Sequence, residues 1–410
     1  MEELIIWIWL NEKCVDKPSA FRKAYDRFGG AREIFEATKE ELEELFGKGS
    51  KTAESLSDKD REPALAVMKN CKRKNIGILT YEDELYPSRL RAINDPPALL
   101  YYKGELPEID NEVCIAAIGT RNPTDYGRRC AYEICWDLTI CGALVISGMA
   151  AGIDGVCHTA ALDAGGKTIA VLGCGVDVVY PAENREIYDR ILKNGAVMSE
   201  YAPGKRATRY SFPRRNRIVS GMSLGSFVIE AQLKSGAMIT ADITKKQNRD
   251  LFALPGKVGE YNSLGPNALI QEGAKAVTTA LDIIKEYEFL YPGKLDPQKC
   301  YVGQRYGIFG DVPVKKRSKN DPPFEVVKNP ETVLFSDKYD EDDYDTSPVY
   351  LEGLSDENAA ICACLSKDRP TSSEEIAAKT GIPLSDLMSL LTILEVQGII
   401  KAAPGDSFFL

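Results

Sequence analysis

A loop of small residues follows a short apolar run near the middle of the chain. Val145, Ile146 and Ser147 lead into Gly-Met-Ala-Ala-Gly-Ile-Asp at 148–154, and a helix-like stretch continues from 155 to 163. Such a strand–loop–helix junction presents free backbone N–H groups and the positive end of a helix dipole to an anion, usually a phosphate. Small side chains let that anion approach the backbone closely. The loop therefore predicts an anion-binding site.

A second turn and a basic block extend this prediction. The turn Gly-Thr-Arg at 119–121 follows the apolar run at 113–118, and the block Arg-Arg-Asn-Arg comes later, at 214–217. Two turns of this kind and a cluster of guanidinium groups together predict a site for a polyanion.

The segment from 201 to 217 is basic and carries no acidic residue. Its cations are Lys205, Arg206, Arg209, Arg214, Arg215 and Arg217, and its interleaved aromatic residues are Tyr201, Tyr210 and Phe212. Such a strip suits single-stranded nucleic acid, because backbone charge supplies affinity and stacking tolerates any base. The alternative, a solvated surface loop, is disfavoured by Ile218 and Val219, which would anchor the strip against the core.

The chain offers little for hydrolytic catalysis. His158 is its only histidine, so a Ser-His-Asp mechanism would have to use that residue. Its place on the helix after the small-residue loop favours a positioning hydrogen bond instead. Asp154, at the mouth of the loop, is expected to cap the following helix rather than to act as a catalytic carboxylate. We therefore predict structural roles for Asp154 and His158 and no catalytic residue.

Nucleotide and metal motifs are missing. The G-x-G-x-x-G fingerprint of nicotinamide enzymes is absent, because no glycine follows Gly119 until Gly127. The sequence Gly-Gly-Lys-Thr at 165–168 lacks the upstream glycine of a Walker A loop and precedes a strand, so a helix C-cap is expected there. The tight cysteine pair Cys362 and Cys364 has no second pair at zinc-ligand spacing. We predict no cofactor and no metal.

Alternating strands and helices surround these motifs. Strands are predicted at 113–118, 143–147, 168–172, 196–199, 227–229 and 251–254, and helices at 126–141, 184–192 and 239–247. This pattern predicts an α/β fold with a mostly parallel sheet covered on both faces. Ligands of such sheets bind beyond the carboxyl ends of the strands, which is where both predicted loops lie.

The flanking regions predict further domains. The pattern of residues 1–70 predicts only helices, compatible with a helix-hairpin-helix-like module or a helical adaptor. Residues 71–110 contain several prolines and are predicted to form a connector packed on a core at 111–290. Residues 291–350 lack periodicity and predict a charged linker. Residues 351–410 predict a winged helix. Its third helix, at 383–397, has no Arg or Lys, which favours a protein contact over DNA reading.

Composition excludes several classes. The chain has 410 residues and a formal net charge of -10, which argues against a non-specific DNA coat but allows a local basic groove. Its 11 cysteines are scattered through apolar segments, as expected for reduced thiols. The apolar stretch at 4–10 is too short for a signal peptide or a membrane span. We expect a cytoplasmic protein without a membrane partner.

Several ordered motifs strongly resemble the DNA-processing protein A (DprA/Smf) family. They are Ile-Gly-Thr-Arg at 118–121 with Tyr-Gly at 126–127, Ser-Gly-Met-Ala-Ala-Gly-Ile-Asp at 147–154 with His158, Tyr-Pro-Ala-Glu-Asn at 180–184, Phe-Pro-Arg-Arg-Asn-Arg-Ile at 212–218, Ser-Gly-Ala-Met-Ile-Thr-Ala at 235–241 and Leu-Pro-Gly at 254–256. The resemblance is dense over 85–284 and looser at both ends.

The resemblance implies an extended Rossmann-like fold that binds and protects single-stranded DNA. It also implies loading of the RecA recombinase, a role in natural transformation, and a homodimer formed through the Rossmann-like domain. By position, Arg121 matches the family's phosphate-binding arginine, and Ser147 and Gly148 match its loop donors. Some family members carry Lys or Arg where this chain has Ala182, so one phosphate contact of the family is not matched here.

From the motifs and the resemblance together we predict a DNA- and phosphate-binding set. Its members are Gly119, Thr120, Arg121, Ser147, Gly148, Met149, Gly152, Asn184, Lys205, Arg209, Phe212, Arg214, Arg215, Asn216 and Arg217.

An enzyme is the competing class. The same sheet architecture resembles lysine-decarboxylase-like phosphoribohydrolases, which cleave nucleoside monophosphates and carry a Pro-Gly-Gly-x-Gly-Thr-x-x-Glu loop. The sequence before Glu230 lacks the Pro-Gly-Gly opening of that loop. A structural adaptor with a vestigial pocket is a third possibility. We predict a binding protein rather than an enzyme.

Overall fold

The computed structural model describes residues 2–300 and, further on, 361, 364–365, 371–383, 387, 390–391, 394, 400–403 and 407–409. The chain divides into two compact units, Met1–Ser318 and Lys319–Leu410. Most of the predicted linker at 291–350 lies outside the described residues.

Short helices build the N-terminal region, as the sequence predicted. They are α1 (Glu2–Cys14), α2 (Pro18–Phe28), α3 (Ala31–Glu36), α4 (Lys39–Phe46), α5 (Lys51–Ser57) and α6 (Glu62–Lys74). Turn chemistry sets their ends. Gly29 ends α2 with a left-handed φ of 91°, and Thr38 and Glu41 form a capping box that begins α4. The region packs around buried side chains that include Trp7, Trp9 and Phe21.

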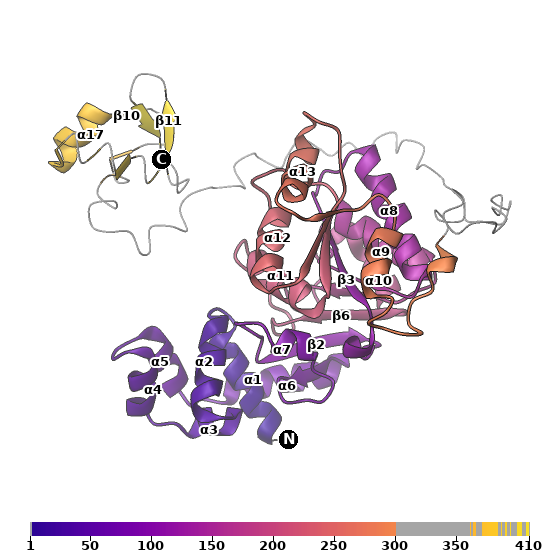
Figure 1. Ribbon diagram of the computed structural model, residues 1–410. Coiled ribbons are helices and arrows are strands. Elements are labelled where there is room, and N and C mark those ends of the chain that lie inside the picture. The colour runs from indigo at the N-terminus through magenta and orange to yellow at the C-terminus, as the bar shows by residue number, and fades with distance from the viewer. Residues whose placement is uncertain are drawn as a thin grey trace. The chain divides into compact units, whose positions relative to one another are not determined.

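A nine-stranded sheet forms the centre of the first unit, in the order β1-β2-β6-β5-β4-β3-β7-β8-β9 (Figure 1). The strands are β1 (Gly77–Thr80), β2 (Leu99–Gly104), β3 (Cys114–Ile118), β4 (Leu144–Ser147), β5 (Thr168–Val171), β6 (Gly195–Ser199), β7 (Gly225–Val228), β8 (Asp250–Ala253) and β9 (Lys275–Ala276). Strands β3 to β9 pair in parallel, for example Ile115 with Val145 and Ala116 with Ser226. The predicted α/β fold with a mostly parallel sheet is confirmed.

The segment interpreted as a connector contributes two strands that the sequence analysis missed. Strand β1 pairs antiparallel with β2, and β2 pairs antiparallel with β6, with Tyr101 opposite Ser199. The prolines at 87, 96 and 97 lie in the turns between these strands rather than inside them. Proline has no backbone N–H, so a proline inside a strand would remove one hydrogen bond of the ladder. Because these prolines lie outside the strands, all ladder hydrogen bonds can form.

Helices cover both faces of the sheet. They are α7 (Ser88–Arg91), α8 (Asp125–Ile140), α9 (Ile153–Asp163), α10 (Arg185–Ile191), α11 (Ser211–Met222), α12 (Gly236–Lys246), α13 (Leu264–Gln271) and α14 (Leu281–Tyr287), with 3₁₀ turns η1 (Ile109–Asn111), η2 (Ala182–Asn184), η3 (Tyr261–Ser263) and η4 (Pro297–Lys299). Successive side chains of β3 point to opposite faces of the sheet. Ile115 and Ala117 pack with α8, α9 and α14, whereas Ala116 and Ile118 pack in the cluster that includes α10, α11 and α12.

The second unit contains β10 (Thr371–Ser372), α17 (Ser373–Thr380), β11 (Lys401–Ala403) and β12 (Ser407–Phe409). The Ser372 hydroxyl accepts the Glu375 N–H at 3.2 Å and caps α17, and Gly381 ends this helix with a φ of 73°. Strands β11 and β12 form an antiparallel hairpin that also pairs with β10. Helix and hairpin match the predicted winged-helix pattern.

Within the part of the chain that the structure describes, no helix combines the length and the apolar character needed to cross a membrane.

His158 ties α9 to β5 inside the sheet layer. The Thr168 hydroxyl donates to the Val145 carbonyl at 2.7 Å, so its oxygen accepts from His158 Nδ1 at 2.8 Å. The imidazole is fully buried, and no described group bonds its Nε2. Burial, aided by the nearby Arg215, lowers the pKa of His158 to about 3. The hydrogen bond joins α9 to β5, and the positioning role of His158 stays a prediction.

This environment predicts a pH-dependent loss of stability. The folded-state pKa lies below the ordinary value of about 6.5, so the unfolded chain takes up the proton first as the pH falls. The contribution of neutral His158 to the free energy of unfolding is fully present above pH 6.5 and decreases as the pH falls toward 3. Between pH 7 and pH 5 we expect wild type to lose about 2 kcal/mol more than His158→Gln.

Urea unfolding followed by tryptophan fluorescence measures this difference, since Trp7, Trp9 and Trp136 all lie in the first unit. Comparison with His158→Gln at each pH cancels the contributions of carboxylates. Equal losses in the two proteins would contradict the buried neutral imidazole.

Candidate nucleic-acid interface

Two loops meet at the carboxyl ends of the neighbouring strands β3 and β4. The Ile153 N–H donates to the Thr120 carbonyl at 3.1 Å. Gly152 has a φ of 78°, and a Cβ there would collide with the carbonyl oxygens of Thr120 and Arg121. Glycine is therefore required at this position. The structure brings the predicted 119–121 and 148–152 loops together into one continuous floor.

Internal partners occupy several polar groups of this floor. Asp154 Oδ2 accepts the N–H groups of Gly148 and Ala150 at 3.1 and 3.3 Å. The Asn184 amide donates to the carbonyl oxygens of Met149 and Ala150 at 2.9 and 3.1 Å. Two of the predicted loop donors, the N–H groups of Gly148 and Ala150, are thus bonded to a carboxylate of the protein. Met149, buried with a φ of 60°, shapes the same turn.

Two detailed expectations for this loop change. Asp154 was predicted to cap the following helix, but α9 has no side-chain cap, and Asp154 binds the loop that precedes it. Ser147 is fully buried, and its hydroxyl donates to the Ala117 carbonyl at 2.6 Å. Burial raises the pKa of Asp154, while Arg215 and the loop N–H groups oppose that rise. Asp154 and Ser147 therefore hold the loop in shape.

Arg215 lies directly beneath this floor. A Cβ on Gly148 would collide with its guanidinium, which donates to the Val171 carbonyl. The Arg215 side chain is buried, and among the described residues its Nε has no hydrogen-bond partner and its charge no ion pair. Burial lowers the pKa of Arg215, and the nearby Asp154 carboxylate opposes that shift. The floor thus carries a buried positive charge.

The exposed face of the site combines a cation with two aromatic rings. The Arg121 guanidinium lies 5.5 Å from the centroid of the Phe212 ring, and the Tyr180 ring lies 5.4 Å from Phe212 on centroids. Gly173, at the end of β5, is close enough that a Cβ there would lie 3.1 Å from the Phe212 ring. We call Arg121, Phe212 and Tyr180 the Arg121 platform. No described carboxylate lies within ion-pair distance of Arg121.

Tyr180 was not among the predicted site residues. Its ring is 45% exposed beside Phe212, although it lies 32 positions earlier in the chain. The Tyr-Pro pair at 180–181 is the only sequence signal that marks this position, and only the fold brings the ring to the platform.

The predicted continuous basic strip is divided by α11. Arg217 is 4% exposed, and its guanidinium pairs with both Glu200 oxygens at 2.7 and 2.8 Å and with Asp95 at 3.3 Å. Arg214 pairs with Asp16 at 2.6 Å. Helical periodicity turns Arg215 and Arg217 toward the interior, so the expectation that Arg217 faces DNA does not fit its position. Its charge is neutralised inside the fold.

The remaining predicted side chains lie around the platform. Lys205 lies 5.3 Å from the centroid of the Tyr201 ring, and Arg209 lies 4.9 Å from that of Tyr210, whose hydroxyl accepts from Arg209 at 2.8 Å. The Asn216 amide contacts the Gly236 carbonyl at 3.4 Å. The cationic groups of Lys205 and Arg209 therefore lie over aromatic rings, in cation–π geometry.

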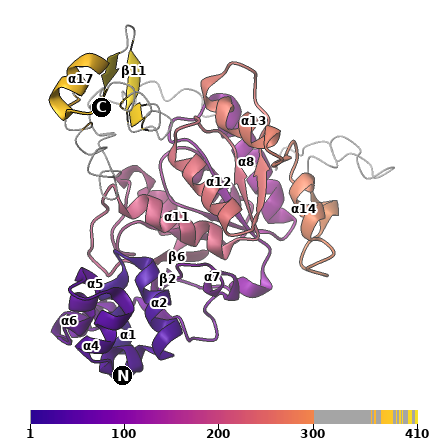
Figure 2. The ribbon, with the colours of Figure 1, turned by 60° about the vertical axis from the view of Figure 1, so that its left-hand side comes forward.

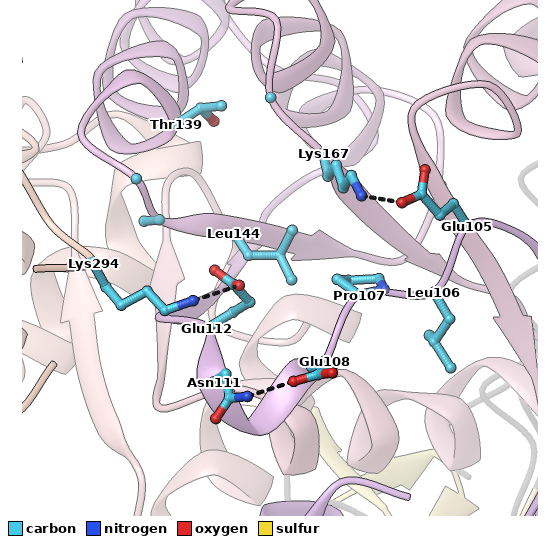
Figure 3. A pocket seen from close by; sticks show the side chains of 13 residues that line it. Glu105, Leu106, Pro107, Glu108, Asn111, Glu112, Thr139, Leu144, Lys167 and Lys294 are labelled. Carbon is cyan, nitrogen blue, oxygen red and sulfur yellow. Dashed lines mark hydrogen bonds and ion pairs between the residues drawn. The ribbon is translucent and has the colours of Figure 1, made fainter. Parts of the chain in front are cut away.

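A separate cavity of about 540 Å³ lies at the amino-terminal edge of β4 and β5 (Figure 3). Ion pairs cross its wall: Lys167 with Glu105 at 2.6 Å and Lys294 with Glu112 at 3.0 Å. Because carboxylates neutralise both lysines, this cavity does not suit a polyanion. The unpaired cation of the Arg121 platform lies at the opposite edge of the sheet.

Glu230, the carboxylate of the enzyme alternative, has structural partners. It is buried, and it accepts the Thr124 N–H at 2.8 Å and the Thr124 hydroxyl at 2.5 Å. Thr124 is the N-cap of α8. The described residues contain no cluster of His, Cys, Asp or Glu that could hold a metal ion. Glu230 thus fastens the start of a helix.

Two family models match this chain. The model described as DNA recombination-mediator protein A matches residues 77–288, and the DprA winged helix domain matches residues 346–406. The second match confirms the predicted winged helix.

Individual relatives agree with these matches. Protein Smf of Synechocystis sp. is 31% identical over 98% of this chain and 98% of its own length. Protein Smf of Escherichia coli is 32% identical over 81% of this chain and 76% of its own length. The structure of DNA processing protein A from Streptococcus pneumoniae superposes with a TM-score of 0.60 and 31% identity, covering 69% of this chain and 97% of that one. This chain therefore belongs to the DprA/Smf family of DNA recombination mediators.

Proposed function

We propose that this protein binds single-stranded DNA as a recombination mediator and that the Arg121 platform is its central contact. The observation that carries this proposal is the exposed Arg121 guanidinium stacked on Phe212, with Tyr180 beside it. A guanidinium can hold a phosphate bidentately, and an aromatic face accepts any base. Membership of a DNA recombination-mediator family supports DNA as the partner.

The predicted residues divide between two proposed roles. Arg121, Lys205, Arg209, Phe212, Arg214 and Asn216 would contact DNA from the surface. Gly119, Thr120, Ser147, Gly148, Met149, Gly152, Asn184 and Arg215 would shape and charge the floor on which a phosphate rests. Arg217 is left out of the interface, because exposing it would break a buried ion pair at a cost of about 3–5 kcal/mol.

Further roles follow from the family resemblance. We propose that the protein protects incoming single strands, helps to load RecA and forms a homodimer through the sheet region at 111–290, in natural transformation and DNA processing. The winged helix at 351–410 is proposed to contact a protein. A cytoplasmic location is supported by the described cysteines, all of which are free.

The enzyme alternative is disfavoured by the surroundings of its two candidate bases. Glu230 bonds the N-cap of α8, and His158 is held neutral and buried beside Thr168. A general base must reach the proton that it abstracts, and both groups are buried and bonded to side chains of the protein. We therefore propose binding without turnover.

DNA binding should favour single strands over duplex and should depend steeply on salt. The platform offers one exposed cation with stacking surfaces, and the predicted recognition helix at 383–397 has no Arg or Lys to enter a major groove. Fluorescence anisotropy with labelled oligo-dT and duplex should give a log–log salt slope of about -0.7 per phosphate contacted. Equal affinity for both forms of DNA would contradict the proposal.

Arg121→Ala should weaken oligo-dT binding about tenfold or more while the fold is retained. A hydrogen bond to a charged group contributes about 1.5–3 kcal/mol, and Arg121 is exposed, so its loss should not destabilise the core. The matched control is Lys285→Ala, which removes one exposed positive charge from α14. The platform assignment fails if the folded Arg121 variant binds as tightly as the control variant.

Purified protein should not hydrolyse nucleoside monophosphates or DNA, with or without divalent metal. Glu230→Gln keeps one acceptor for Thr124, so this variant should fold and bind oligo-dT as wild type does. Product analysis by chromatography provides the measurement. Cleavage that wild type performs and Glu230→Gln abolishes would establish the phosphoribohydrolase or nuclease alternative.

A further inference from the structure

Two basic segments without acidic residues meet beside the interface. Between Pro63 and Asn75 the chain carries Lys69, Lys72, Arg73 and Lys74 and no acidic residue. The segment from 201 to 217 is also basic and also lacks acidic residues. The first segment lies in α6, in the helical N-terminal region, and the second lies in the sheet region. Lys74, Arg214 and Arg217 pair with carboxylates of the protein, whereas Lys69, Arg73, Lys205 and Arg206 have no carboxylate at ion-pair distance among the described residues.

The contacts that join the segments are specific. The Asn70 amide contacts the Pro203 carbonyl at 3.5 Å. Lys74 pairs with Asp177, whose carboxylate also accepts the Gly204 N–H at 2.7 Å. The last turns of α6 are therefore fastened to the turn at 203–204. Figures 1 and 2 both show the helical region against the β2 and β6 side of the sheet.

Backbone contacts link the 203–205 turn to the Arg121 platform. Phe212 of the platform lies over Gly173 at the end of β5. Two residues later, the Gly175 N–H donates to the Lys205 carbonyl at 2.8 Å. Lys205 in turn follows Gly204, which shares Asp177 with Lys74. An unbroken series of contacts thus leads from the platform to α6.

Lys69 and Arg73 are exposed on this surface. Within the described residues, neither has a carboxylate at ion-pair distance, and Arg73 only donates to the Asn70 side chain at 3.0 Å. Basic residues in a last helical turn often complement the helix dipole. That effect fades within one turn, so it does not account for Lys69, which lies before the final turn of α6. The charges are available to an external anion.

We propose that Lys69, Arg73, Lys205 and Arg206 form a second binding surface, the α6 track, for the backbone of the same DNA strand. This inference rests on the proposed single-stranded DNA function. The strand would leave the Arg121 platform across the 203–206 turn and reach α6. Lys69 and Arg73 have no neighbouring exposed ring on α6, so this part would bind phosphates without base stacking. The helical N-terminal region would thereby lengthen the DNA site.

A comparison of oligonucleotide lengths tests this extension. Lys69→Ala/Arg73→Ala should weaken binding of a long oligo-dT of about twenty nucleotides roughly tenfold and lower its salt slope by about 1.4, at about 0.7 per lost contact. Binding of a short oligo-dT of about five nucleotides, which reaches only the platform, should not change. Lys69→Arg/Arg73→Lys, which keeps both charges, should bind both lengths as wild type does.

The control is Lys48→Ala/Lys51→Ala, which removes two exposed charges from the α4–α5 part of the same region. Figure 1 shows α4 and α5 at the side of the helical region away from α6. The α6 track is refuted if the Lys69/Arg73 variant weakens both lengths equally or neither, or if the control weakens the long oligonucleotide as much. Arg121→Ala, measured on the short oligonucleotide, reports separately on the platform, so the two failures are distinguishable.

Discussion

The site depends on the close approach of two backbone segments at the carboxyl ends of β3 and β4. Gly152 lies against the carbonyl oxygens of Thr120 and Arg121, where no side chain fits, and Ile153 bonds to Thr120. This contact fixes the loop that carries Arg121 against the loop that covers Arg215. An exposed and a buried guanidinium are thus held on either side of one thin layer of backbone.

Asp154 determines which N–H groups of the 148–152 loop are available to an anion. Its carboxylate takes up the N–H groups of Gly148 and Ala150, which in an open phosphate loop would face a ligand. These two N–H groups are therefore not available to a ligand while Asp154 holds them. Positive charge comes instead from Arg121 above and Arg215 below, and specificity for single strands would come from the rings of Phe212 and Tyr180. In the proposed site, side chains would therefore supply the positive charge that the backbone supplies in many phosphate sites.

The arginines of 214–217 show why charge in sequence does not equal charge at a surface. Arg214 pairs with Asp16, Arg215 supports the floor, and Arg217 is buried against Glu200 and Asp95. The partners of Arg214 and Arg217 lie far away in the chain, from Asp16 to Glu200. A buried pair of this kind costs several kcal/mol to break, so Arg217 serves the fold. Neighbouring arginines therefore have unlike roles.

The sequence by itself determined the elements with strong local signals. Apolar runs predicted six of the seven parallel strands and missed only the short β9, and the ordered motifs predicted the family. Tertiary structure alone decided the pairing of β1 and β2, the place of Tyr180, the burial of Arg217 and the meeting of α6 with the 203–206 turn. The difference has a physical cause: periodicity and capping act over a few residues, whereas pairing, burial and charge neutralisation depend on partners that only the folded chain brings together.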